Sequence, residues 1–261
     1  MSTHRIAPIP AGFDSPFAYS SLSHVLTLWQ CDRSEVEKSH RTLIGDYQFV
    51  GDDDSVLVAV SYQSYFADYG RAALISHELE LGAVVLPPGV EPPTLEDFLS
   101  GADQRGIAGI WPSAVYCDCD PAIAAGRAIY GEPKFAADFE IDVPAPNAPG
   151  DAWHVSAAAE DRTCELELEL EGKPVERPGQ PIVNYGKRDS GEVVSSRWDI
   201  FLGGRWWGEQ ASASARFSEA VARSASQRHA ELMSARCVQV REHRSPVVAQ
   251  RSRPFYPQTA L

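Results

Sequence analysis

Residues 163–171 (TCELELELE) alternate leucine with glutamate. Successive side chains of a β-strand point to opposite faces of the sheet, so only a strand separates these two residue types cleanly. One face then carries the leucines and the other carries the glutamates: Leu166, Leu168 and Leu170 against Glu165, Glu167, Glu169 and Glu171. We interpret the acidic face as the solvated side of a sheet rather than as a carboxylate metal site.

Further strands are expected where β-branched and aromatic residues run between turn residues. They cover residues 25–29, 55–63, 72–81, 107–116 and 192–201, with a further strand beginning at Trp206. Turn-like residues at 67–70 and 202–205 separate neighbouring strands. We therefore predict a mainly β (α+β) fold.

Helices are predicted where a polar residue can cap the first turn. Asp32, followed three residues later by Glu35, indicates a helix through about Leu43, and Thr94 with Asp97 indicates a short helix over 95–99. The Ala-, Ser- and Arg-rich stretch 217–234 is also predicted to be helical.

The chain of 261 residues is expected to form a single domain over residues 21–261, preceded by a proline-containing arm at 1–20. Its C-terminal segment is basic, with eight arginines: Arg216, Arg223, Arg228, Arg236, Arg241, Arg244, Arg251 and Arg253. We expect these arginines to pair with glutamate-bearing sheets of another subunit or domain.

Composition narrows the classes of partner. A net charge of −13 argues against nucleic acid or an anionic membrane surface. No apolar run is long enough for a membrane helix, and the N-terminus lacks a secretory signal, so a cytoplasmic location is expected. The five cysteines are scattered, which favours reduced thiols, and Cys117 with Cys119 lacks the second ligand pair of a zinc site. No metal is predicted.

Several common catalytic motifs are missing from the sequence. It contains no GxGxxG, P-loop, GxSxG or HExxH pattern, which removes the sequence support for dinucleotide, nucleotide, serine-hydrolase and common zinc-protease chemistry.

Residues 120–135 (DPAIAAGRAIYGEPKF) are the most informative stretch. They resemble the signature of the acetoacetate decarboxylase superfamily, in which a P-A-I-x-x-G-R-E segment precedes a P-K-K segment with the Schiff-base lysine. Lys134 falls on that lysine, and the N-Y pair at Asn184 and the W-G pair at Trp207 are similar to later landmarks of the family.

The resemblance implies a closed antiparallel β-barrel or cone with a few peripheral helices, assembled as a homo-oligomer. It also implies imine formation between Lys134 and a small oxo acid or a related carbonyl compound. No cofactor is needed, because the protonated imine itself accepts electrons. A lysine of ordinary pKa about 10.4 is protonated at neutral pH, so such a nucleophile has to be activated, and acetoacetate decarboxylase is a familiar example of an enzyme with an activated lysine.

The sequence departs from the family pattern at several positions. Phe135 replaces the second lysine, and Ala128 replaces the glutamate after the arginine. The family's carboxylate-binding arginine should fall near Ser23 or His24, and neither has a guanidinium group. One pocket glutamate is retained as Glu78, and the other falls at Gln63.

Glu132 precedes Pro133, which favours extended backbone, so Glu132 and Lys134 should project to the same side. A carboxylate beside the amine suits chemistry that moves protons, such as aldol condensation or dehydration, better than simple decarboxylation. We therefore favour aldolase–dehydratase chemistry. A true β-keto acid decarboxylase that uses another cation, and a non-catalytic binding or assembly module, stay open as alternatives.

The predicted site thus has two groups of residues. Lys134 is the expected nucleophile, and Glu132 and Glu78 manage protons. The expected substrate-binding residues are Gln63, Tyr116, Arg127, Phe135 and Trp207. The chain has only four lysines, and Lys134 alone lies in a motif of this kind.

Overall fold

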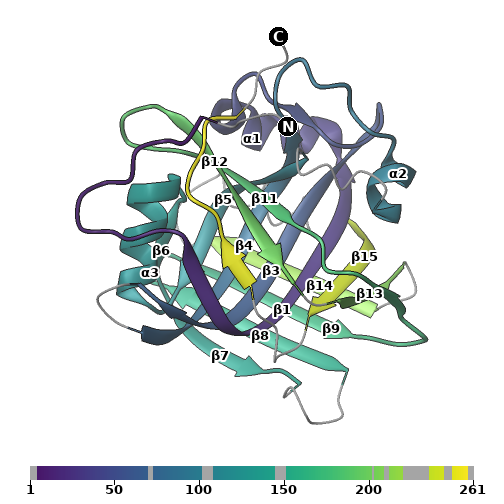
Figure 1. The fold of residues 1–261 in the computed structure, drawn as a ribbon. Helices are drawn as coiled ribbons and strands as arrows, with labels where there is room; N and C mark the ends of the chain where they lie inside the picture. Colours follow the sequence, from purple (N-terminus) through teal and green to yellow (C-terminus); the bar gives the residue numbers. More distant parts are fainter. Residues whose placement is uncertain are drawn as a thin grey trace.

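The structure is a computed structural model that describes residues 5–69, 73–101, 108–144, 151–201, 203–208, 212–219, 235–243 and 249–257. It is mainly β with a few peripheral helices, as predicted (Figure 1). The strands form a large twelve-stranded sheet and a separate four-stranded sheet.

The pairings of the large sheet close into a ring. The ring runs through β1 (Phe17–Asp32), β3 (Ser55–Asp68), β4 (Ala73–Leu86), β5 (Gly109–Cys117), β11 (Ile182–Lys187), β12 (Val193–Ile200) and β16 (Ala249–Arg251), and then back to β1. β1 is long enough to pair with β16 through its first residues and with β15 (Arg236–His243) further along. The predicted closed sheet is confirmed.

Shorter strands extend the ring at its edges. They are β2 (Gln48–Phe49) on β4, β6 (Lys134–Ala136) on β5, β13 (Gly204–Trp207) on β15 and β10 (Val175–Arg177) on β13. The sheet is not wholly antiparallel, because β5 pairs in parallel with both β6 and β11. A helical crossover between β5 and β6 returns the chain in the same direction, which is what a parallel pair requires.

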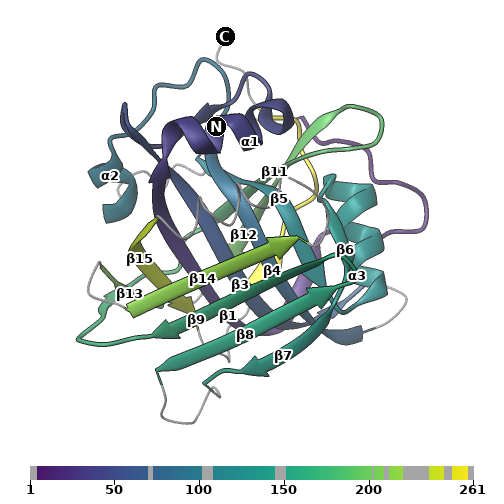
Figure 2. The same cartoon turned by 180° about the vertical axis from the view of Figure 1, so that it is seen from behind.

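The second sheet contains β7 (Asp138–Asp142), β8 (Ala152–Ala159), β9 (Arg162–Glu169) and β14 (Ser212–Glu219), and Figure 2 shows it lying across the ring. β9 is the strand predicted from the leucine–glutamate alternation. Its Leu166 and Leu168 are buried in the main core together with Tyr62 of the ring. The glutamate side chains lie on the other, more exposed face. The alternation therefore predicted both the strand and its buried face.

The predicted helix over 217–234 is wrong at its start. Residues 217–219 belong to β14, which pairs along the edge of β9 with Phe217 opposite Cys164. Pairing with an available strand edge outweighs a modest helix propensity. The remaining part of that prediction lies outside the described residues.

The helix caps follow the sequence prediction. α1 (Arg33–Ile44) begins after Asp32, whose side chain accepts a 3.1 Å hydrogen bond from the Glu35 amide. α2 (Leu95–Ser100) begins after Thr94, which accepts from the Asp97 amide at 3.1 Å. In the described part of the chain, no helix combines the length and the apolar character needed to cross a bilayer.

A further helical segment leads into the motif that contains Lys134. α3 (Asp120–Ala125) passes directly into a π-helical turn, η1 (Gly126–Tyr130), and Gly131 ends it in the left-handed conformation. The chain then enters β6 at Lys134. β1 begins at Phe17, which lies inside the predicted arm. The arm boundary at residue 20 and the single domain over 21–261 stay predictions.

Candidate active site

Lys134 lies inside the protein and is only 3% exposed. Its Nζ donates a hydrogen bond to Glu78 Oε1 and lies 3.4 Å from Glu132 Oε2. Glu78 comes from β4, whereas Glu132 and Lys134 come from the segment after η1. Glu132 and Lys134 therefore do project to the same side, and the structure brings together the three residues predicted to be catalytic.

The two carboxylates set the charge of the lysine. Burial lowers the pKa of Lys134, but the Glu78 and Glu132 carboxylates raise it by more, and the net pKa lies well above its ordinary value. Opposite charges within hydrogen-bond distance stabilise the protonated amine more than desolvation destabilises it. Lys134 is therefore a buried ammonium group when no substrate is bound.

Gly126 leaves the space through which the lysine side chain runs. A Cβ at this position would lie 2.6 Å from Lys134 Cδ, 2.7 Å from Lys134 Cε and 2.8 Å from Glu132 Oε2. Such distances are too short, so either the lysine or the π-helical turn would have to move. The lysine position thus depends on a glycine in this turn.

Gly126→Ala is expected to lower the free energy of unfolding by about 1–3 kcal/mol, the usual cost of overpacking a tightly filled site. The sign is informative, because alanine in place of a helical glycine is otherwise stabilising. Urea unfolding measures the change. Gly208→Ala is the control, since nothing lies within 4 Å of a Cβ there. Equal stability changes in the two variants would contradict the close contact.

Glu78 is held by two hydrogen-bond donors on the neighbouring strand. Gln63 Nε2 donates to Glu78 Oε2 at 2.6 Å, and the Tyr65 hydroxyl donates to Oε1 at 2.6 Å. Gln63 stands directly opposite Glu78 in the β3–β4 register, which explains the contact. The two positions that the resemblance gave to the family's pocket glutamates, Glu78 and Gln63, are therefore in direct contact.

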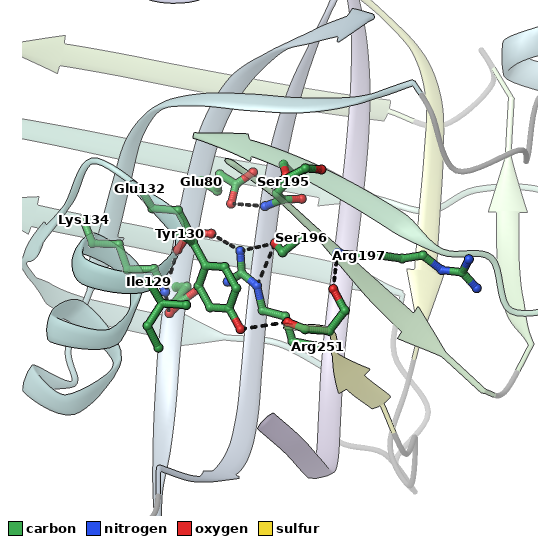
Figure 3. Close-up of polar contacts among 12 residues, drawn as sticks. Glu80, Ile129, Tyr130, Glu132, Lys134, Ser195, Ser196, Arg197 and Arg251 are labelled. Atoms are coloured by element: carbon green, nitrogen blue, oxygen red, sulfur yellow. Dashed lines mark hydrogen bonds and ion pairs between the residues drawn. The ribbon is translucent and has the colours of Figure 1, made fainter. Parts of the chain in front are cut away.

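Glu132 is paired with an arginine from the other end of the chain (Figure 3). Arg251 Nη2 donates to Glu132 Oε1, while its Nε and Nη2 also donate to Ser196 Oγ at 3.0 and 2.8 Å. Its guanidinium carbon lies 3.7 Å from the centre of the Tyr130 ring. Burial raises the pKa of Glu132, but Arg251 and Lys134 lower it by more, so the net pKa lies below its ordinary value.

Arg251 differs from what we expected of the C-terminal arginines. β16 places it inside the ring, between β1 and β12, and there it meets Glu132 of its own chain rather than the glutamates of β9. It also supplies a cation that neither Ser23 nor His24 can provide. His24, at the position where an arginine was sought, is buried, and burial and then His243 and Arg241 hold its pKa well below the ordinary value.

A small cavity adjoins this network. Its volume is about 20 Å³, room for about one water molecule. Its polar lining comes from seven side chains: His24, Ser61, Gln63, Glu78, Glu80, Asn184 and Arg251. Lys134 is not part of this lining and reaches the cavity through its contact with Glu78. The cavity thus brings a guanidinium group and two carboxyl groups to one space beside the lysine.

Glu80, which was not among the residues predicted from the sequence, is the second carboxyl group in the cavity. It lies two residues after Glu78 on the same face of β4, and Asn184 Nδ2 donates to its Oε2 at 3.3 Å. Burial, followed by repulsion from Glu132 and Glu78, raises the pKa of Glu80 to about 8. Glu80 therefore keeps its proton at neutral pH and can donate it.

Glu80 should make stability fall as pH rises from about 4.5 to about 8. The unfolded carboxyl ionises near its ordinary pKa of 4.5, whereas the folded one holds its proton until about 8. A pKa raised by folding contributes stability that is lost across this window, here roughly 5 kcal/mol. Glu80→Gln should remove that slope in urea unfolding at stepped pH, and Glu96→Gln, on an exposed helix face, should leave it. Parallel profiles for wild type and Glu80→Gln would contradict the assignment.

Arg127 fixes the backbone beside the lysine. Its side chain is exposed, and its Nε donates to the Lys134 carbonyl oxygen at 2.5 Å. The guanidinium thus ties η1 to β6. Arg127 was expected to bind the substrate, and in the structure this contact orients the loop beside the lysine.

Of the five predicted substrate-binding residues, only Gln63 lines the cavity. Arg127, Tyr116, Phe135 and Trp207 do not. Tyr116 and Phe135 pack edge to face, with their ring centres 4.6 Å apart, in the core between the ring and the second sheet. Each of these two residues is the strand neighbour of a residue that faces into the ring. Because successive side chains of a strand point to opposite faces, both aromatic rings point away from the cavity. Trp207 is buried in the same core and lies under the Arg205 guanidinium at 5.0 Å.

The described residues contain no group of three or more His, Cys, Asp or Glu side chains placed to hold a metal ion. None of the five cysteines forms a disulfide bond in the described structure.

Comparisons with known proteins agree with this architecture. The family model described as Acetoacetate decarboxylase (ADC) matches residues 56–236. No curated protein sequence matches the chain significantly.

Three solved structures share the fold. Acetoacetate decarboxylase from Legionella pneumophila is 12% identical, with a TM-score of 0.59 over 97% of this chain and 92% of that one. The enduracididine biosynthesis enzyme MppR, complexed with pyruvate, is 11% identical, with a TM-score of 0.58 over 96% and 90%. An acetoacetate decarboxylase-like enzyme from Sphingomonas wittichii is 13% identical, with a TM-score of 0.57 over 100% and 99%. Because the family model covers more than half of the chain, the protein belongs to the acetoacetate decarboxylase family.

Proposed function

We propose that the protein is a cofactor-independent enzyme that forms a Schiff base between Lys134 and a small oxo acid and then carries out aldolase–dehydratase chemistry. One observation carries the proposal: a buried lysine contacts two carboxylates, one of which lines a cavity that also holds an arginine and a protonated carboxyl group. Family membership and the pyruvate complex of the structural neighbour MppR support the same class of substrate.

The buried ion pairs suit the intermediate as well as the resting lysine. Lys134 first gives a proton to Glu78, which accepts it at the contact already present. The free amine then adds to the ketone carbon, and loss of water leaves a protonated imine. This iminium carries the same positive charge as the ammonium did, so Glu78 and Glu132 stabilise it too.

Arg251 is the proposed anchor for the carboxylate of the substrate. Its Nε and Nη2 are used by Ser196 and Glu132. Within the described part of the chain, Nη1 has no hydrogen-bond partner, and Arg251 lines the cavity. A guanidinium group binds carboxylates well because its N–H groups are fixed in a plane.

The proton acceptor and the proton donor at the site favour aldol and dehydration steps. Glu78, once it has accepted the lysine proton and passed it on with the water, can take a proton from the carbon next to the iminium and so form an enamine. Glu80 is protonated at neutral pH and can donate to an oxygen that leaves or develops charge. Decarboxylation needs neither group at the C–C cleavage step.

The test is exchange of the methyl protons of pyruvate for deuterium, followed by NMR in D₂O. Enamine formation predicts exchange that depends on the protein and disappears in Lys134→Met. Lys187→Met is the matched control, because Lys187 is an exposed lysine of β11. Exchange that is equal in both variants, or absent from the wild type, would contradict enamine chemistry at Lys134.

A β-keto acid decarboxylase is the second candidate. This alternative needs a cation other than the family's arginine near residue 24, and Arg251 can serve as that cation. It predicts CO₂ release from acetoacetate without the need for a second carbonyl substrate. A non-catalytic module on the same fold predicts neither CO₂ release nor exchange. Assembly as a homo-oligomer and a cytoplasmic location also stay predictions, and sedimentation of the purified protein tests the first of them.

A further inference from the structure

The interior of the ring changes character along its strands. One row of side chains, set side by side across β4, β3, β1 and β15, is polar: Glu78, Gln63, His24 and His243. The row two residues further along the same four strands is mixed: Glu80, Ser61, Leu26 and Arg241. The step between rows is about 7 Å. In this second row, Leu26 is the one apolar side chain, and it stands between Ser61 and Arg241.

A second cavity lies beside Leu26 and Arg241 and has a volume of about 40 Å³. Leu26, Leu28, Val84 and Phe98 are among its walls, and Arg241 contributes the charged group. The cavity shares two lining residues with the first one, Ile110 and Ile182. The two cavities are therefore neighbours, and these isoleucines lie between them.

Arg241 is a buried cation for which the described residues supply no buried anion. Arg241 is only 8% exposed. Its guanidinium carbon lies 4.1 Å from the centre of the Trp206 ring and 5.5 Å from the centre of the Phe98 ring. Nε donates to Gln239 Oε1 at 2.7 Å, and Nη2 lies 3.4 Å from the Phe98 carbonyl oxygen. Among the described residues, no carboxylate forms an ion pair with it, and Nη1 makes no hydrogen bond.

Burial of the Arg241 charge without a counter-ion costs free energy, unless a bound anion supplies the opposite charge. A buried charge normally has a counter-ion, because the surrounding apolar groups cannot replace its hydration. Burial lowers the pKa of Arg241 to about 9, which expresses the same cost. The flat guanidinium group, held between two rings and a carboxamide, leaves one N–H edge for a planar anion.

We propose that the second cavity holds the far end of the substrate, where Arg241 pairs with a second carboxylate. The substrate is then an oxo diacid: one carboxylate binds Arg251, the ketone reacts with Lys134, and an apolar chain passes Ile110 and Ile182 to the second carboxylate. This inference rests on the proposed Schiff-base function and names the class of substrate for it.

The experiment compares diacids with monoacids of the same length on the full chain. 2-Oxoglutarate, 2-oxoadipate and 2-oxopimelate are each incubated with the protein, reduced with borohydride and quantified as adducts by intact mass. 2-Oxohexanoate, which has a methyl group where 2-oxoadipate has its second carboxylate, is the matched monoacid. At one chain length, the diacid should half-saturate capture at a concentration about tenfold lower, the value of one charged hydrogen bond.

Arg241→Met should remove this advantage while capture of pyruvate stays unchanged. Arg177→Met is the matched control: Arg177 also lies over the Trp206 ring, at 5.7 Å, but is exposed, and its loss should preserve the preference for the diacid. Equal half-saturation for diacid and monoacid in the wild type would overturn the inference, and this comparison holds even if Arg241→Met does not fold. An equal loss of pyruvate and diacid capture in a folded Arg241→Met would overturn it too.

Failure of the proposed function itself gives a different result. In that case no oxo acid is captured at Lys134, and calorimetry with adipate, which has no ketone, decides the binding question separately. Adipate binding to the wild type that weakens about tenfold or more in Arg241→Met supports the anion site. Absence of adipate binding, or equal binding to both proteins, overturns it.

Discussion

Arg251→Met is expected to lower the free energy of unfolding by about 3–5 kcal/mol, the usual result of removing one partner from a buried ion pair. Glu132 would be left buried beside Lys134 alone, and its pKa would rise because the guanidinium that lowers it is gone. Urea unfolding at pH 7 measures the change. Arg253→Met is the control, because Arg253 lies two residues further on, is exposed, and donates to the Ser15 carbonyl oxygen at 3.2 Å.

A double variant separates the ion pair from general damage to β16. Arg251→Met combined with Glu132→Gln removes both charges and should recover at least half of the lost stability, because no unpaired charge then remains between them. If Arg251→Met costs no more than Arg253→Met, or if the double variant is as unstable as the sum of its parts, the buried pair is not what holds β16 in the ring.

Lys134→Met should abolish enamine-dependent exchange, with a loss on the order of 10³-fold or more, as for the removal of other catalytic nucleophiles. The side chain of methionine fills similar space beside Gly126 but cannot add to a ketone. The loss should appear in kcat. Lys187→Met should retain the full rate, and circular dichroism should show that both variants keep the β fold. Residual turnover above one tenth in folded Lys134→Met would contradict the role of the lysine.

The fold was predictable from the sequence wherever a local pattern had a single structural explanation. The leucine–glutamate alternation of β9 fits only a strand, and Asp32 and Thr94 cap the helices that follow them. The pattern failed for Phe217–Glu219, where the ladder with β9 decides the conformation. The closure of the ring was also beyond local pattern, because β16 has only three residues and pairs with strands distant in sequence.

The site was predictable where a motif or a strand register connects its residues. The segment at 120–135 gave Lys134 and Glu132, and Gln63 faces Glu78 across β3 and β4. Glu80 could have been found from Glu78, because residues two apart on a strand share a face. The same alternation could have excluded Phe135, the neighbour of inward-facing Lys134.

Arg251 could not be found in this way. Nothing in the sequence near it signals a pocket, and by sequence alone it is one of several arginines in a basic C-terminal segment. Only the pairing of β16 with β1 and β12 places its guanidinium beside Glu132. The chain therefore has no arginine at the expected position near His24. Arg251, close to the C-terminus, supplies a guanidinium group to the site instead.

Borohydride reduction in the presence of pyruvate tests the central claim most directly, because it converts the imine into a permanent bond on the lysine that formed it. Intact mass gives the stoichiometry, and peptide mapping identifies the modified residue among the four lysines. Our account predicts one adduct per chain on Lys134, which is lost in Lys134→Met and retained in Lys187→Met. An unmodified Lys134, with every tested oxo acid untrapped or captured only at Lys38, Lys173 or Lys187, would contradict it.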